Sequence, residues 1–157
     1  YLQLVLGAVM RHTQSGLAIP DFPTMGGSFL PVFNDSVMHH INDWRYMNGY
    51  DPVTLSQVIY HFLHRLGALF VLGAVIMLNV TGFNDKTMDP KLKGFILIID
   101  ALITIQIALG VWTVLSLKHP HITSVHVMMG AAMLGFTFLM LLKSAPKSFN
   151  HFKATWN

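Results

Sequence analysis

The sequence contains no cysteine and no glutamate, and its seven acidic residues are all aspartates. Without cysteine the chain has no disulfide, no thiolate nucleophile and no cysteine-ligated zinc or iron–sulfur centre. Charged residues are also scarce, because they make up 11% of the chain, whereas soluble domains carry about 25%. A surface so poor in charge cannot face water on every side, so the composition indicates an integral membrane protein.

Long apolar runs take the place of the missing charge. Three of them, 58–80, 94–117 and 122–142, are each close to the ~20 residues that a helix needs to cross a bilayer. A fourth, 1–11, is about half that length, and we expect it to be the end of a helix truncated at the N-terminus of a fragment. The sequence predicts an all-α fold, with a single membrane domain over 1–157 built as a four-helix bundle.

The distribution of lysines predicts the orientation. Loops rich in Lys and Arg remain cytoplasmic, and such residues follow the second and fourth predicted helices: Lys86, Lys91, Lys93, Lys143, Lys147 and Lys153. The segments 12–57 and 118–121 then lie on the outer, periplasmic side of a bacterial plasma membrane. This asymmetry explains the net charge of +3, so the expected partner is membrane lipid and not nucleic acid.

The outer segment 12–57 combines an irregular part with one predicted helix. Its first half is dense in glycine and proline, which favours loop structure. Its second half predicts a short surface helix with Asp35 or Ser36 as the N-cap. Residues 51–52 are expected to form the cap and first turn that lead towards the next membrane helix.

A weak internal repeat relates the two halves of the chain. The pattern Gln-x-x-Leu-Gly occurs at 3–7 and again at 106–110. His64 and His126 come later in each half, and each is followed by a glycine nine residues on. Each half is therefore predicted to be a hairpin, in which a Gln-bearing helix goes out and a His-bearing helix returns.

The two histidines lie at matched depths in the predicted topology. His64 is ~9 Å and His126 ~6 Å below the outer face, at 1.5 Å rise per residue. Two imidazoles at one level suit axial ligation of a haem iron from opposite sides. Gly67, Ala68 and Gly130 lie on the same helix faces and leave room for a flat macrocycle, although small residues equally suit close helix packing. The alternative is that both histidines are polar anchors or interhelical hydrogen-bond donors.

Three cationic or polar side chains near the outer rim are candidates to bind the carboxylates of such a group. Arg65 is a planar, bidentate donor suited to a haem propionate. Arg11 either faces a propionate or is a snorkelling anchor. His61, one turn before His64, either hydrogen-bonds a propionate or a quinone, or has a structural role at the interface.

Two further polar sites have alternative interpretations. His39, His40 and Asp43 either hold a metal ion or belong to a solvated surface. Asp100 lies inside the third predicted helix, where a charge is costly, so it pairs with a neighbour, stays protonated, lies near water or belongs to a proton path.

Three stretches resemble the haem A synthase family: "LGAVMRHTQSGLAIPDFP" (6–23), "HFLHR" (61–65), and "IQIALGVWTVLS" (105–116) followed by His126. These membrane oxidoreductases oxidise a methyl group of haem O to the formyl group of haem A for terminal oxidases. Members have two similar four-helix halves, each with a histidine pair. The likeness extends over about residues 2 to 142, and is greatest to the C-terminal half, which resembles a haem b site.

The resemblance implies that His64 and His126 are the axial iron ligands of haem b, and that haem O and haem A are substrate and product. It also implies an electron donor, which the sequence does not identify, and an N-terminal homologous half or a second copy as partner. Many relatives have a cysteine pair where this chain has Ile19 and Met25, and the catalytic half has a glutamate where this chain has His61. The alternative to an enzyme is therefore a standalone cytochrome b-like electron carrier without haem O oxidation.

Overall fold

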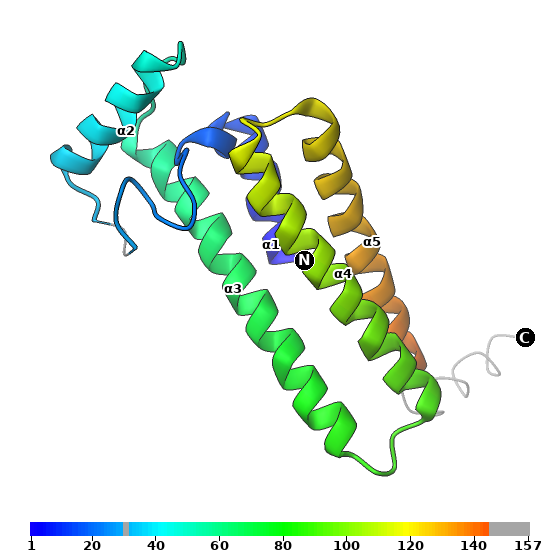
Figure 1. The fold of residues 1–157 in the computed structure, drawn as a ribbon. Helices are drawn as coiled ribbons and strands as arrows, with labels where there is room; N and C mark the ends of the chain where they lie inside the picture. Colours follow the sequence, from blue (N-terminus) through cyan, green and yellow to red (C-terminus); the bar gives the residue numbers. More distant parts are fainter. Residues whose placement is uncertain (30–31, 145–157) are drawn as a thin grey trace, which may run out of the picture.

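The structure is a computed structural model that describes residues 1–29 and 32–144. The regular secondary structure of this part of the chain is helical (Figure 1), apart from one isolated β-bridge between Met25 and Ser28, and irregular segments connect the helices. The elements in order are α1 (Leu2–His12), the short 3₁₀ helix η1 (Ser15–Leu17), α2 (Asp35–Met47), α3 (Leu55–Asn84), α4 (Pro90–Leu115) and α5 (Pro120–Ser144). The predicted all-α fold is confirmed, with α2 as a fifth helix outside the four that were expected to form the bundle.

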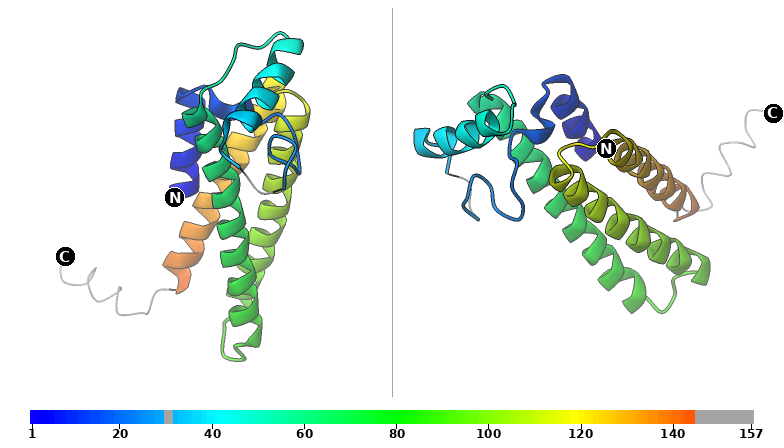
Figure 2. Two further views of the ribbon diagram at one scale, coloured as in Figure 1. Left: turned by 90° about the vertical axis from the view of Figure 1, so that its left-hand side faces the viewer. Right: turned by 45° about the horizontal axis from the view of Figure 1, so that its top comes forward.

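Among the described residues, three helices are long and apolar enough to cross a membrane: α3, α4 and α5. Few of their side chains are buried within the chain, which is expected when lipid and not protein covers an apolar helix. The chain is therefore an integral membrane protein. In Figure 2, α4 runs antiparallel to α3, α5 returns beside α4, and α1 lies beside the half of the bundle that is nearer to α2.

The ends of two helices differ from the sequence prediction because capping residues lie elsewhere. The N-cap of α2 is Asn34, whose side chain accepts a hydrogen bond from the Val37 N–H, so neither Asp35 nor Ser36 is the cap. The N-cap of α3 is Thr54, which forms a reciprocal capping box with Gln57. Residues 51–52 consequently precede the helix, and the outer segment ends three residues before the predicted limit of 57.

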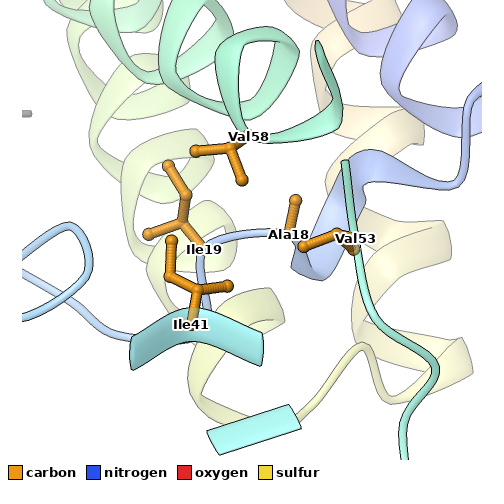
Figure 3. Packing of buried hydrophobic residues seen from close by; sticks show 5 residues of the cluster. All are labelled: Ala18, Ile19, Ile41, Val53 and Val58. Atoms are coloured by element: carbon orange, nitrogen blue, oxygen red, sulfur yellow. The ribbon is translucent and has the colours of Figure 1, made fainter. Parts of the chain in front are cut away.

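Two apolar clusters stabilise the two ends of the molecule. The outer cluster joins the outer segment to the start of α3 (Figure 3) and consists of Ala18, Ile19, Ile41, Val53 and Val58. The inner cluster joins α3, α4 and α5, and consists of Val75, Ile96, Ile99, Ile103 and Met140. The outer segment is thus a packed lobe that is fixed to the bundle.

Asp100 finds a partner inside the bundle. Its Oδ1 accepts a hydrogen bond of 2.7 Å from the side-chain amide of Asn79, which also donates to the Val75 carbonyl. Of the alternatives for this residue, pairing with a neighbour is the one observed. The contact links α3 to α4 by a polar bond in the region of the inner cluster.

Candidate functional site

His64 and Gln3 form the contact between α1 and α3. The Gln3 amide nitrogen donates to the His64 carbonyl at 3.0 Å and lies 3.2 Å from the ring atom Nδ1. The imidazole rests on Gly7, where a Cβ would be 3.4 Å from Cε1, and the Gln3 amide rests on Gly67, where a Cβ would meet Oε1. Each helix therefore offers a glycine to the polar side chain of the other.

The second half of the chain repeats this arrangement between α4 and α5. The imidazole of His126 rests on Gly110, where a Cβ would be 3.1 Å from Cε1. The Gln106 amide rests on Gly130, where a Cβ would be 3.1 Å from Nε2. The weak sequence repeat is therefore a repeated packing unit, in which a glutamine and a histidine on antiparallel helices each lie over a glycine of the partner.

The two packing units meet at the same level of the bundle. A Cβ at Gly130 of α5 would also lie 3.2 Å from Cδ2 of Leu4 in α1, so the helices of the two halves are in contact. Gln3 of α1 lies against Gly67 of α3, and its neighbour Leu4 lies against Gly130 of α5. The two packing units therefore lie side by side at one level of the bundle.

Three buried polar atoms of this region have no hydrogen-bond partner within the described residues: Gln3 Oε1, Gln106 Oε1 and His126 Nδ1. A buried acceptor left without a donor costs about 1–3 kcal/mol. Native chains seldom contain such atoms unless a bound group or a function accounts for them. All three belong to the two packing units, which marks this region as the candidate site.

Arg65 lies one helical position beyond His64 but points to the outer segment. Its guanidinium donates to three backbone carbonyls at 2.9–3.1 Å, those of Ile19, Asp21 and Thr24. Its Nε also donates to His61 Nε2 at 3.2 Å. One N–H of Nη1 remains for another acceptor, so the bidentate geometry expected for a propionate is already used by the loop.

His61 is buried, with 2% of its surface exposed. The Ile19 N–H points at its Nδ1 at 3.1 Å, and Arg65 points at its Nε2 at 3.2 Å. A neutral imidazole has one acceptor nitrogen, so the ring accepts from one of these donors at a time. Its contacts join α3 to the outer lobe.

The remaining candidates are at the surface. Arg11 is exposed in the last turn of α1. His39 and His40 are exposed on α2, and no group of three or more metal-binding side chains occurs among the described residues. The metal interpretation of this helix is therefore not supported by its geometry.

The Asp21 carboxylate organises the loop that Arg65 grips. Its two oxygens accept hydrogen bonds of 2.9 Å from the N–H groups of Gly26 and Gly27. Burial would raise the pKa of Asp21, but hydrogen bonds from Thr24 and from these two amides outweigh it and lower the pKa below its usual value. The ionised carboxylate is therefore the form that this loop stabilises.

The sequence marks both histidines as candidates but does not show which residues contact them. The Gln-x-x-Leu-Gly repeat is visible in the sequence, yet only the structure pairs each glutamine with the helix that carries the histidine. The sequence signal for this pairing is that glutamine and glycine four positions apart share one helix face. The role of Arg65 in the outer loop had no sequence signal, because its acceptors are backbone carbonyls.

Comparison with known proteins gives one family. Residues 1–138 match the COX15-CtaA family model, described as cytochrome oxidase assembly protein. Among curated proteins, the chain is 34% identical over 116 residues to the heme A synthase of Rickettsia bellii, which covers 73% of this chain and 31% of the relative. It is 31% identical over 126 residues to that of Rickettsia prowazekii, covering 80% and 34%. It is 33% identical over 144 residues to that of Pelagibacter ubique, covering 92% and 39%.

The chain spans about a third of the length of these curated relatives. No solved structure matches it significantly.

Proposed function

The chain belongs to the COX15-CtaA family of cytochrome oxidase assembly proteins, and from this premise we propose that it is the haem-holding half of a haem A synthase-like membrane oxidoreductase. The curated relatives that it resembles are named heme A synthase. In the proposed reaction, the complete protein oxidises a methyl group of haem O to the formyl group of haem A. The single observation that carries the proposal for this chain is the pair of packing units that bring His64 and His126 to one level.

The residues present fit a haem with two imidazole ligands. His64 and His126 come from two different membrane helices, and the buried Nδ1 of His126 lacks a hydrogen-bond partner in the described part of the chain. Neutral imidazole is a common ligand of haem iron. Apart from the amides of Gln3 and Gln106, the contacts around the two histidines come from glycines and leucines, which suits a flat hydrophobic macrocycle.

We propose that the imidazoles of His64 and His126 would hold the haem iron, and that a haem held by two imidazoles would supply electron transfer. This half would therefore hold haem b and pass electrons, while haem O would bind in an N-terminal homologous half or in a second copy. His61 supports this division of labour, because it occupies the position at which the resemblance puts an acid in the catalytic half.

The outer rim is proposed to bind the carboxylates of the same haem. Arg65 contributes its charge and its one remaining N–H, and Arg11 is an exposed cation in the last turn of α1. His61 is proposed to act through Arg65, since its ring contacts the guanidinium. The outer lobe then lies on the periplasmic side of a bacterial plasma membrane.

The first test is haem binding by the purified 157-residue chain. Addition of haem b should give a Soret band with the sharp, low-spin visible bands typical of two imidazole ligands. His64→Ala and His126→Ala should each lose that spectrum, whereas the matched controls His39→Ala and His40→Ala should keep it, because those rings are exposed on α2. A His64→Ala chain with the spectrum of the parent would refute the ligand assignment.

The absence of glutamate favours a second candidate, a standalone cytochrome b-like electron carrier. The two candidates differ in what a partner half adds. Co-expression with an N-terminal half that contains Glu-x-x-His should yield haem A from haem O if the chain is part of the enzyme. A chain that binds haem but gives no haem A with such a partner would be the carrier.

A further inference from the structure

We propose that Gln3 is a positioning residue, which accepts a hydrogen bond from the Nδ1–H of His64 when that imidazole binds iron through Nε2. Gln106 is the corresponding positioning residue for His126. This inference deepens the proposed function and rests on it. It assigns roles to two half-buried side chains whose buried amide oxygens the ligand assignment alone leaves unexplained.

The first argument is the state of the two glutamines. Oε1 of Gln3 and Oε1 of Gln106 are buried, and neither has a donor among the residues that the structure describes. An amide oxygen can only accept hydrogen bonds. Each packing unit therefore contains one buried acceptor that requires a donor.

The second argument is the protonation that iron binding imposes on a histidine. A neutral imidazole has one N–H, so a ring that binds metal through Nε2 carries its proton on Nδ1. Metal-binding histidines almost always donate this second N–H to a nearby oxygen. Among the described residues, Nδ1 of His126 is buried without a hydrogen-bond partner. Loading the site thus fixes the ring N–H at Nδ1 in each unit, which gives one donor for each unmatched acceptor.

The third argument is the geometry of the first unit. The Gln3 amide nitrogen already lies 3.2 Å from Nδ1 and 3.5 Å from Nε2 of His64. For Oε1 to reach Nδ1, the amide must turn about its terminal torsion, which exchanges its nitrogen and oxygen. This turn gives up the 3.0 Å hydrogen bond from the amide nitrogen to the His64 carbonyl.

In the second packing unit, between α4 and α5, the histidine and the glutamine each lie over a glycine of the other helix. The His126 ring lies over Gly110, one turn after Gln106, and the Gln106 amide lies over Gly130, one turn after His126. The two side chains are therefore neighbours across the contact of α4 and α5. The proposal pairs the two orphaned atoms of this contact, Oε1 of Gln106 and Nδ1 of His126.

A hydrogen bond from Nδ1–H to an amide oxygen makes the imidazole a stronger donor to iron. Such a ligand stabilises the ferric form and lowers the reduction potential. Gln3→Leu and Gln106→Leu should therefore raise the potential and weaken haem binding roughly 10- to 100-fold. Gln3→Glu and Gln106→Glu should shift the potential in the opposite direction, since a carboxylate is a stronger acceptor.

The test uses the full chain loaded with haem b, and measures the reduction potential and the electron paramagnetic resonance g values. The matched control is Gln57→Leu, which removes a glutamine of α3 whose amide donates to the Thr13 carbonyl at 2.9 Å. We expect the Leu and Glu variants of Gln3 and Gln106 to shift the reduction potential in opposite directions. The Gln57→Leu control should keep the potential and the g values of the parent. The Glu variants provide the answer if a Leu variant does not fold.

The inference would be overturned if both the Leu and the Glu variants kept the parent potential and g values, or if all of them shifted as the control does. Failure of the proposed function gives a different result. In that case the parent chain itself shows no low-spin haem spectrum, and the inference falls with it.

Discussion

Two arginines hold the outer lobe by its backbone. Arg65 donates to the carbonyls of residues 19, 21 and 24, and Arg45 donates to the carbonyls of Leu17 and Asp51. The planar guanidinium suits this task because it presents several donors in fixed directions. Residues 17–24 and the carbonyl of Asp51 are consequently held in place although they belong to no long helix.

The pH response of this loop depends on Asp21. Its pKa is lowered in the folded chain, so its contribution to stability is fully present above its unfolded pKa and is lost as the pH falls through the folded value. Asp21→Asn should cost about 1 kcal/mol at neutral pH, a modest value because the carboxylate is partly exposed. Thermal unfolding followed by circular dichroism should show a lower Tm for Asp21→Asn at pH 7.

The difference between the parent and this variant should shrink as the pH is lowered below about 4, where the carboxylate gains its proton. Asp43→Asn is the control, because Asp43 is exposed on α2. A gap in Tm between the parent and Asp21→Asn that persists unchanged at acid pH would contradict the role of the ionised form.

At the scale of the elements, each packing unit depends on two glycines, one against the histidine ring and one against the glutamine amide. Gly7, Gly67, Gly110 and Gly130 each lie against a polar side chain of another helix, whereas a Cβ at Gly73 or Gly135 would meet nothing within 4 Å. The glycine that follows each histidine at nine residues was part of the sequence repeat. The structure shows that these two are not the contact glycines.

Gly110→Ala and Gly135→Ala should therefore have opposite effects. Alanine is more favourable than glycine in a helix by about 1 kcal/mol, so Gly135→Ala should raise the Tm in detergent. Gly110→Ala gains the same propensity but places its Cβ 3.1 Å from Cε1 of His126, so the ring must move. It should lower the Tm and weaken haem binding. Equal Tm shifts for the two variants would show that the contact at Gly110 is unimportant.

The sequence predicted the helices better than their contacts. The apolar runs of α3, α4 and α5 are a direct consequence of the need to satisfy every backbone group within a bilayer, so their existence and order could be predicted. The cap at Thr54 was missed because Pro52 offered an earlier helix start. The sequence does not predict the pairing of Gln3 with His64, because residue spacing shows which residues share a helix face but not which other helix packs against that face.

At the scale of the whole molecule, the proposed orientation can be tested with introduced cysteines, because the chain has none of its own. Ser36→Cys lies in α2 of the outer lobe, and Thr87→Cys lies in the turn between α3 and α4; both positions are exposed. A maleimide that cannot cross membranes should label Ser36→Cys in spheroplasts and should label Thr87→Cys only after the membrane is opened. The reverse pattern would invert the orientation.

The central claim is that His64 and His126, one from each packing unit, hold a single haem iron. The most direct measurement is electron paramagnetic resonance of the ferric, haem-loaded chain and of His64→Gly and His126→Gly. The parent should be low-spin, each variant should be high-spin, and added imidazole should restore the low-spin signal by occupying the space of the missing ring. Variants that remain low-spin without added imidazole would contradict the claim.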